Sequence, residues 1–415
     1  MNELLEKCTL ARAAAQKLIS VETTVKDAAL DAIANALIAR ADEIIAANDK
    51  DIAAAKEKGT RQAMIDRLTL TKERIEGIAE GVRQVKALSD PIGEVTKMWK
   101  RPSGLLIGQK RVPMGVIAII YEARPNVTVD AAVLCLKTSN VCVLRGGSEA
   151  INSNVAIMKI MQEAAYGAGL PEGSLNIIED TSRETATKLM QMNGYIDMLI
   201  PRGGKGLIKS VVENATVPVV ETAAGNCHVY VDGSADMDMA VKIVLNAKVQ
   251  RPSVCNAAET LLVDKKIADE FIPKVFKALK EKDVEIRADE ASRKIYSDVN
   301  SADEEDYYTE YNDYIMAVKI VDGVDEAIAH INKYNTKHSE AIVTNDYKAS
   351  QKFLNEVDAA AVYVNASTRF TDGFEFGFGA EIGISTQKMH ARGPMGLEAL
   401  TSIKYIIYGD GQIRE

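Results

Sequence analysis

The sequence predicts an α/β protein made of two successive blocks, in each of which short apolar strands alternate with helices. In the first block, residues 116–120 and 141–144 are continuous apolar runs separated by a segment of helical period. Strands that are apolar at every position are typical of parallel sheets with helices on both faces. The same alternation starts again after Asn226. A chain of 415 residues is also too long for one simple core, so two or three domains are expected.

The amino-terminal region is predicted to be helical. The first 88 residues are alanine-rich, and Leu30, Ile33 and Leu37 fall on one face of a helix. This pattern indicates a helical layer that covers a sheet. Residues 98–111 instead alternate around a Pro-Ser-Gly turn, which predicts a protruding β-hairpin.

The first αβ block is predicted to form a parallel sheet that binds a ligand at the carboxyl ends of its strands. Helices are expected between the strands, with one running through residues 206–214. The expected strands are residues 116–120, 141–144, 174–178, 196–200 and 217–220.

The second block repeats the pattern, with expected strands at residues 229–231, 261–263, 315–321, 341–343 and 361–364. An acidic, tyrosine-rich patch at residues 303–314 is expected to be a solvated loop. Residues 365–391 are glycine-rich and lack periodicity, which predicts a functional loop. Residues 405–408 predict a last strand, and we expect this strand and the hairpin to pair between subunits of a homo-oligomer, a dimer or larger.

Composition excludes several classes of partner. A net charge of −9 and a pI of about 5.3 disfavour nucleic acid and anionic membranes. The five cysteines include no C-x-x-C pair, so a reducing cytosol is expected and disulfides are not. The four histidines form no metal-binding motif, so we expect no metal. The first residues lack the basic start and apolar core of a signal peptide, and no apolar run approaches membrane length.

Cys255 is the strongest candidate for a reactive group. Arg251 and Pro252 end the preceding helix, which puts Cys255 just past a turn and before the strand at 261–263. Arg251 and the polar neighbours Ser253 and Asn256 could hold the thiol partly as thiolate. A buried structural cysteine is the alternative that a lone cysteine leaves open.

Two glycine-rich turns follow strands of the first block. Glycines let backbone N–H groups approach a phosphate, and a helix amino terminus favours its charge. Either turn alone is weak evidence because such turns are common, but two of them beside cations raise the case for a nucleotide site. The turns contain Arg145, Gly146, Gly147 and Ser148, and Pro201, Arg202, Gly203 and Gly204.

The order of these features resembles the aldehyde dehydrogenase superfamily. Glu221 precedes Cys255 by 34 residues, as the glutamate and the nucleophilic cysteine of that family do. The resemblance covers essentially the whole chain, through the segments YEARPNVT (121–128), LRGGSEA (144–150), ETAAGNCH (221–228), RPSVCN (251–256) and HARGPMGLE (390–398).

The resemblance implies a Rossmann-like NADP-binding domain, an α/β catalytic domain and a small β oligomerisation element. The implied boundaries are residues 1–91 and 112–223 for the cofactor domain and 224–400 for the catalytic domain. The oligomerisation element would comprise residues 92–111 and 401–415.

The branch of the family that reduces an acyl phosphate matches best. This implies NADPH-dependent reduction of L-glutamyl 5-phosphate to glutamate 5-semialdehyde, a step of proline synthesis, through a thioester on Cys255. Two alternatives stay open. Glu221 occupies the general-base position of hydrolytic NAD(P)-dependent aldehyde dehydrogenases, and a cofactor-free thiol acyltransferase or a silent scaffold is the third hypothesis.

The resemblance also implies roles for individual residues. The family's oxyanion-binding asparagine falls at Ala123, so Asn126 is the candidate second donor beside the Cys255 N–H group. Arg145 replaces the family's ribose-binding lysine and could grip a 2′-phosphate, which favours NADPH. Glu310 is placed at the nicotinamide ribose. The candidate substrate-binding residues are Arg124, Asn365, Ser367, Thr368, Arg369 and Lys388.

Overall fold

The computed structural model describes residues 2–122, 124–222 and 224–414, which fold into two compact units. The first unit comprises the described residues of 1–221, 378–383 and 395–415. The second comprises those of 222–377 and 384–394. The glycine-rich stretch predicted at residues 365–391 is therefore divided between the two units.

A four-stranded parallel sheet forms the centre of the first unit, in the order β5-β4-β3-β6. All six residues of β3 are buried, because helices cover the sheet. Three of its strands match predicted runs closely, and β5 is shorter than expected. The strands are β3 (Val116–Tyr121), β4 (Val141–Arg145), β5 (Leu175–Ile177) and β6 (Met198–Arg202).

The predicted strand at residues 217–220 is wrong: only Val219 forms an isolated bridge, with Leu199 of β6. Leu199 N–H donates to the Pro218 carbonyl, and Val220 N–H donates back to Leu199. Pro218 has no N–H group to continue a ladder, which explains why the pairing stops there.

The amino-terminal helices form the predicted layer. Helix α1 packs directly on the strands, whereas α2, α3 and α5 pack on α6 and α7. The helices of the first unit are α1 (Asn2–Leu18), α2 (Thr23–Ala39), α3 (Ala41–Glu57), α4 (Gln62–Leu68), α5 (Lys72–Ala87), α6 (Asn126–Lys137), α7 (Ile151–Gly167), α8 (Arg183–Leu189) and α9 (Lys205–Asn214), with short 3-10 turns η1 (Ser148–Ala150) and η4 (Leu397–Leu400).

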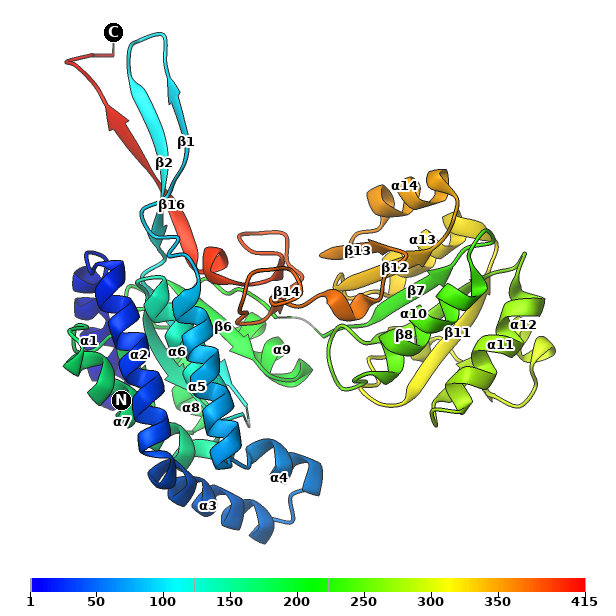
Figure 1. Ribbon diagram of the computed structural model, residues 1–415, viewed down its shortest axis with the longest axis horizontal. Helices are drawn as coiled ribbons and strands as arrows, with labels where there is room; N and C mark the ends of the chain where they lie inside the picture. Colours follow the sequence, from blue (N-terminus) through cyan, green and yellow to red (C-terminus); the bar gives the residue numbers. More distant parts are fainter. Residues whose placement is uncertain (1, 123, 223, 415) are drawn as a thin grey trace. The chain divides into compact units, whose positions relative to one another are not determined.

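A separate three-stranded antiparallel sheet extends from the first unit (Figure 1). It joins the predicted hairpin, β1 (Val95–Lys100) and β2 (Leu106–Pro113), to the last strand, β16 (Thr401–Tyr408). Most positions of β1 and β16 are exposed, including the apolar side chains of Met98 and Ile407.

The second unit is built on a seven-stranded sheet in the order β10-β9-β11-β8-β7-β12-β13, every pairing of which is parallel. Strand β8 is its central strand. The strands are β7 (Cys227–Val231), β8 (Ala258–Asp264), β9 (Glu285–Ala288), β10 (Asn300–Ser301), β11 (Ile315–Val321), β12 (Ser339–Val343) and β13 (Ala361–Val364). Strands β14 (Ile384–Ser385) and β15 (Gly393–Pro394) form a separate two-stranded antiparallel sheet.

Alternate side chains of each strand enter two separate cores. Val229 and Val231 of β7 join a cluster with α10 and α11, whereas Tyr230 joins α13 and α14 on the other face. The helices are α10 (Met237–Val249), α11 (Ala268–Lys280), α12 (Glu290–Ile295), α13 (Gly323–Tyr334) and α14 (Tyr347–Glu356), with turns η2 (Glu305–Tyr308) and η3 (Thr368–Phe370).

The acidic patch at residues 303–314 is not simply a solvated loop. Asp306 and Tyr307 within it are 6% and 8% exposed. Burial opposes ionisation of Asp306, but hydrogen bonds from Asp303 N–H, Arg287 and the Tyr311 hydroxyl hold its pKa below its usual value. The short strands β9 and β10 and helix α12 were also not predicted.

Candidate active site

Cys255 lies in a loop between the end of α10 and the start of β8, which we call the nucleophile loop (residues 250–257). Its side chain is half-buried, while the other four cysteines are buried. Burial raises the pKa of Cys8 to about 11 and that of Cys142 to about 12, so these thiols stay protonated near neutral pH. Cys255 is therefore the cysteine whose exposure suits a nucleophile.

The underside of the nucleophile loop is packed tightly. The Cys227 thiol donates a hydrogen bond to the Cys255 carbonyl oxygen (Sγ–O 3.2 Å). A Cβ atom on Gly225 would overlap the Cys255 carbonyl group, so only glycine fits there. The Gly225 N–H group donates to Glu310 Oε1 at 2.6 Å. Glu310, predicted to touch the cofactor ribose, thus holds the chain segment that lies under Cys255.

Asn256 ties the nucleophile loop to the segment around η3. Its side-chain amide donates to the Thr371 carbonyl oxygen at 2.9 Å. Its own carbonyl accepts from the Thr368 hydroxyl at 2.7 Å. The Thr371 hydroxyl in turn bonds to Ser339 of β12 at 2.6 Å. These contacts fix the peptide that follows Cys255.

Arg369 is a cation that interacts electrostatically with Cys255. Its Nε donates to Gln250 Oε1 at 2.7 Å, and its Nη1 donates to Asn256 Oδ1. Burial and the nearby Arg251 lower the pKa of Arg369, while attraction to Cys255 partly offsets them. This geometry suits stabilisation of a thiolate or of a substrate anion.

The remaining predicted substrate residues divide into two groups. Ser367 caps the start of η3, accepting from Arg369 N–H at 3.3 Å, and with Thr368 lies in the segment that contacts the nucleophile loop. Asn365 instead exchanges hydrogen bonds of 2.9 Å with the backbone of Thr344. Lys388 forms an ion pair of 2.9 Å with Asp358.

The first glycine-rich turn connects β4 to η1 and α7. Gly146 packs against Asn154 and the Tyr121 ring so closely that a Cβ atom would clash. Gly147 is the amino-terminal cap of η1, and Ser148 begins it. Arg145 donates to the carbonyls of Thr181 and Ser182, and its buried Nε has no partner among the described residues. Burial lowers the pKa of Arg145.

The second glycine-rich turn leads from β6, which contains Pro201 and Arg202, into α9. Gly204 caps α9, and its N–H group donates to Glu122 Oε2 at 2.9 Å. A Cβ atom on Gly203 would lie 2.6 Å from the same oxygen. A carboxylate thus accepts at this helix amino terminus, where an anionic group is favoured, and a diphosphate bound there would have to replace it.

The other predicted catalytic residues lie in the first unit. Asn126 begins α6, and its amide donates to Asp130 Oδ2 at 2.9 Å, a bond it would have to exchange to serve an oxyanion. Burial raises the pKa of Asp130 to about 6. Arg124 is exposed just before α6. Glu221 is the last residue of the first unit's long segment, and Ala123 lies outside the described residues.

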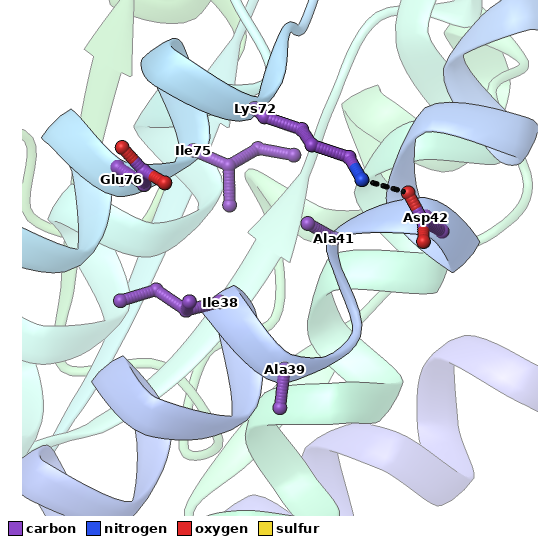
Figure 2. Close-up of a pocket in the computed structure, with 7 residues that line it drawn as sticks. All are labelled: Ile38, Ala39, Ala41, Asp42, Lys72, Ile75 and Glu76. Atoms are coloured by element: carbon purple, nitrogen blue, oxygen red, sulfur yellow. Dashed lines mark ion pairs between the residues drawn. The ribbon is translucent and has the colours of Figure 1, made fainter.

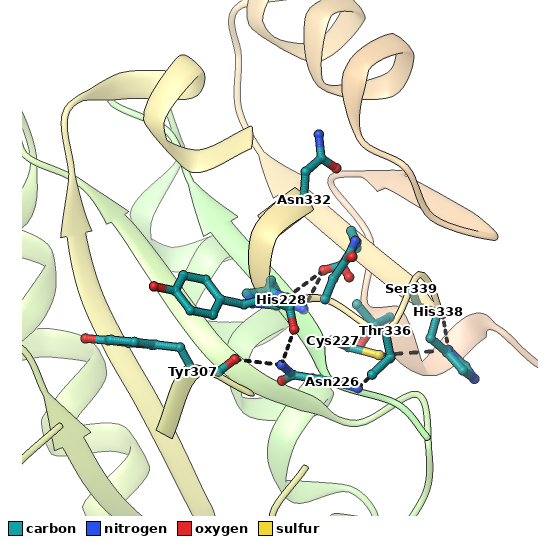
Figure 3. Close-up of polar contacts among 12 residues, drawn as sticks. Asn226, Cys227, His228, Tyr307, Asn332, Thr336, His338 and Ser339 are labelled. Atoms are coloured by element: carbon teal, nitrogen blue, oxygen red, sulfur yellow. Dashed lines mark hydrogen bonds and ion pairs between the residues drawn. The ribbon is translucent and has the colours of Figure 1, made fainter. Parts of the chain in front are cut away.

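Figure 3 shows a buried polar network that begins beside Cys227. The Asn226 amide donates to the carbonyls of Tyr307 and Tyr334, and the Thr336 hydroxyl accepts from Asn226 N–H. Next along β7, His228 contacts Glu340 at 3.0 Å. Within residues 2–122, 124–222 and 224–414, no cluster of His, Cys, Asp and Glu could hold a metal ion.

A hollow of ≈ 70 Å³ lies in the helical layer of the first unit (Figure 2). Its lining includes an ion pair between Lys72 and Asp42 at 2.8 Å and the aliphatic side chains of Ile38 and Ile75. It brings together no nucleophile and no pair of carboxylates positioned for acid–base chemistry, so it is not a candidate catalytic site.

Sequence reasoning missed several residues of this site. Gly225 and Glu122 stand inside the segments that carry the family resemblance, so their position was a usable signal, whereas Asn256 was named only as a polar neighbour of Cys255. Gln250 had no such signal, because its contact with Arg369 joins residues 119 positions apart.

Comparison with known proteins agrees with this geometry. The chain matches the Aldehyde dehydrogenase family over residues 2–313 and 307–406. It is 64% identical over its full length to the complete gamma-glutamyl phosphate reductase of Clostridium perfringens strain 13, and 62% identical to that of Caldicellulosiruptor bescii, again over 100% of both chains. The crystal structure of gamma-glutamyl phosphate reductase from Thermotoga maritima superimposes with a TM-score of 0.98 at 51% identity, covering 100% of each chain. The chain belongs to the aldehyde dehydrogenase family, in the branch that contains the gamma-glutamyl phosphate reductases.

Proposed function

We propose that this protein reduces L-glutamyl 5-phosphate to L-glutamate 5-semialdehyde and phosphate, with NADPH as reductant, in proline biosynthesis. The observation that carries the proposal is the half-buried Cys255, next to Asn256 and within the electrostatic influence of Arg369. The relatives that are 60–64% identical over the full chain are named for this reduction.

The chemistry begins at the Cys255 thiolate. Its sulfur attacks the acyl carbon, a C–S bond forms, and the bond from the acyl carbon to the phosphate oxygen breaks as phosphate leaves. The nicotinamide cofactor, when bound, supplies a hydride to the acyl carbon. The resulting thiohemiacetal on Cys255 collapses, the C–S bond breaks, and the aldehyde leaves. Cysteine suits both steps because its thiolate is nucleophilic near neutral pH and is also a good leaving group.

The oxyanion formed in both steps needs hydrogen-bond donors. The Cys255 N–H group is one. The carbonyl of the same peptide, that of Val254, accepts from Ala257 N–H at 3.0 Å, and Cys227 and Thr368 bind the carbonyls of the next two residues. Asn126 is the proposed second donor. Arg369, with Ser367 and Thr368, is the proposed binding group for the charged substrate. Asn365 and Lys388 are weaker proposals because their side chains bind Thr344 and Asp358. Arg124 is proposed from the family resemblance alone.

The cofactor is proposed to bind at the two glycine-rich turns of the first unit. Gly203 and Gly204 would hold its diphosphate at the start of α9, beside Pro201 and Arg202. Arg145 with Gly146, Gly147 and Ser148 would hold the adenosine ribose. The unpaired Arg145 Nε favours a phosphate on that ribose, hence NADPH. Glu310 is the proposed contact of the nicotinamide ribose.

The test is an NADPH oxidation assay with freshly generated glutamyl phosphate. We expect absorbance of NADPH to fall only when the acyl phosphate is present, with glutamate semialdehyde as product. Absence of oxidation in a folded protein that binds NADPH would contradict the proposal. A thermal shift with NADPH separates this case from a cofactor-free acyltransferase or a scaffold, because ligand binding raises the melting temperature by mass action.

A hydrolytic aldehyde dehydrogenase is the second candidate, and Glu221 at the family's general-base position is the observation that favours it. We propose instead that Glu221 manages the Cys255 proton and does not activate water. Given glutamate semialdehyde and NADP, reduction of NADP should then require phosphate or arsenate and stop after one turnover without them. Sustained turnover without phosphate, lost in Glu221→Gln, would favour the hydrolytic enzyme.

We propose that the protein is a cytoplasmic homo-oligomer. Exposed apolar side chains on both outer strands of the three-stranded sheet, such as Met98 and Ile407, support pairing with a second copy. Light scattering of Ile407→Lys, which should lower the oligomer mass, tests this. Among the described residues no helix has the length and apolar character needed to cross a membrane.

A further inference from the structure

Two fully buried charged residues stand at the two ends of the nucleophile loop. Lys248 is in the last turn of α10, and Glu259 is the second residue of β8. Their side chains form an ion pair of 2.5 Å, and neither is exposed to solvent. The loop that carries Cys255 is thus closed at its base by one charge–charge contact.

The same pair reaches the segment that carries Glu310. Glu259 Oε1 accepts from the Asn312 N–H group at 3.2 Å, and the Lys248 ammonium lies 5.9 Å from the centre of the Tyr311 ring. Glu310 at the start of this segment accepts from Gly225, which packs under the Cys255 carbonyl. The Lys248–Glu259 pair therefore contacts both the ends of the nucleophile loop and the segment 310–312, and these two parts of the chain surround Cys255.

Stability alone is a poor explanation for this pair. Removing two charges from water costs several kcal/mol per ion, and apolar replacements of buried ion pairs are often neutral or stabilising. Burial lowers the pKa of Lys248 and raises that of Glu259 to about 7. In both residues burial thus disfavours the charged form, against the attraction between the two partners. A pair at the two ends of the nucleophile loop instead fixes the conformation of the loop, because its partners determine where the loop begins and ends.

We propose that Lys248 and Glu259 are positioning residues for Cys255, which close the nucleophile loop and hold residues 310–312 against it. This inference rests on the proposed function for its catalytic readout. The pair touches neither substrate nor cofactor. It acts through the Cys255 peptide, whose N–H group must face the oxyanion, and through Glu310, which supports Gly225.

The test compares Lys248→Met, Glu259→Gln and the double variant Lys248→Met/Glu259→Leu. Alkylation of Cys255 by iodoacetamide is followed by mass spectrometry of its peptide, together with kcat, KM, NADPH affinity and urea unfolding. The double variant removes both charges and should regain stability. We expect all three to lower kcat about a hundredfold, the loss typical of a 1 Å misplacement, and to slow alkylation about tenfold. NADPH affinity should fall much less than kcat, because Glu310 is one proposed cofactor contact and the two glycine-rich turns of the first unit supply the others.

The first unit provides a matched control. Lys26 and Asp90 form another buried ion pair, also of 2.5 Å, with side chains 1% and 7% exposed. Lys26→Met should lower stability as the single variants of Lys248 and Glu259 do. It should leave the Cys255 alkylation rate and kcat unchanged, because its contacts are with the carbonyl of Lys137 and with Ser139 in the first unit.

The result that overturns the proposal is a folded double variant with the parent alkylation rate and kcat, which would make the pair purely structural. Equal losses in Lys26→Met would also overturn it. Alkylation needs no substrate, so the positioning role is tested even if the wild-type protein fails to oxidise NADPH. Failure of that oxidation would contradict the proposed function and leave the alkylation result intact. If Lys248→Met does not fold, the alkylation rate and kcat of Glu259→Gln, which retains the shape of the side chain, decide whether the pair positions Cys255.

Discussion

The two units present polar sites at strand ends, but they build them in different ways. In the first unit the sites are turns whose donors are mainly backbone N–H groups, as at Gly204 before α9. In the second unit the nucleophile loop is held by side chains from distant segments, including Cys227, Thr368 and Arg369. The first kind of site depends on local chain geometry and the second on the tertiary structure.

This difference determines what each site tolerates. Backbone donors survive most side-chain changes nearby, provided that the glycines keep their space. A loop held by several remote side chains changes shape when any one of them is altered, because buried polar groups cannot lose partners cheaply. Substitutions far from Cys255 in sequence should therefore affect chemistry, whereas those in the first unit should affect mainly cofactor affinity.

Replacing the nucleophile gives the largest expected separation of the two units. Cys255→Ala should abolish reduction while NADPH affinity and the unfolding free energy stay near those of the parent, since no thioester can form. Activity and fluorescence titration with NADPH measure the two properties. Cys8→Ala and Cys142→Ala are controls that should keep at least partial activity. Inactivation by iodoacetamide through Cys8 or Cys227 would contradict the assignment.

Adding one methyl group to a glycine of each unit sharpens the comparison. Gly225→Ala places a Cβ atom on the Cys255 carbonyl, so the loop must move, and kcat should fall about a hundredfold. Gly203→Ala crowds Glu122 and Leu207 and should instead weaken NADPH binding by about 1–3 kcal/mol. Gly206→Ala is the control, because nothing lies within 4 Å of its added methyl. A Gly225→Ala variant with normal kcat would contradict the proposed difference between the second unit, where substitutions affect kcat, and the first, where they affect cofactor affinity.

Sequence reasoning succeeded where structure is local. The apolar run at 116–120 became β3, and the residues 361–364 became β13 (Ala361–Val364) without shift. It failed at Pro218, where the missing N–H group stops a ladder, and at Asp306, which is buried by contacts with Arg287 and Tyr311. Residue patterns report the faces of single elements, but not which remote side chain will close on a polar group.

A smaller effect is expected at the cofactor ribose. Arg145→Ala should weaken NADPH more than NADH, because a charge-assisted hydrogen bond to phosphate is worth about 1.5–3 kcal/mol. The ratio of the two KM values should therefore change about tenfold or more, with kcat largely kept. Arg183→Ala, at the exposed start of α8, is the control. An unchanged ratio would place the 2′-phosphate elsewhere, for instance at Arg202.

Acid should weaken the second unit before the first, since the buried His330 and His338 both lie in the second. Burial lowers the pKa of His330 to about 2 and that of His338 to about 4. Both are lower than in the unfolded chain, about 6.5. The unfolded state therefore binds more protons, and stability falls as pH drops below about 6.5, by up to about 1.4 kcal/mol per pH unit for each histidine.

Hydrogen exchange at pH 7 and pH 5 measures this difference between the units. Amides of β7 and β12 should lose protection at the lower pH more than those of β3 and β4. His330→Phe should reduce the pH dependence, provided the ring fits among Tyr307 and Tyr334. Equal loss of protection in both units would show that the histidines do not set the acid response.

The central place of β8 in its sheet bears on how the protein matures. The nucleophile loop leads into this strand, and its contacts join residues as far apart as 225, 255, 310 and 369. Contacts of such long sequence separation form late, because the chain must first close large loops. We therefore expect a nascent chain to carry Cys255 as an ordinary thiol, and any reactivity that its folded surroundings confer to arise only when the sheet is complete.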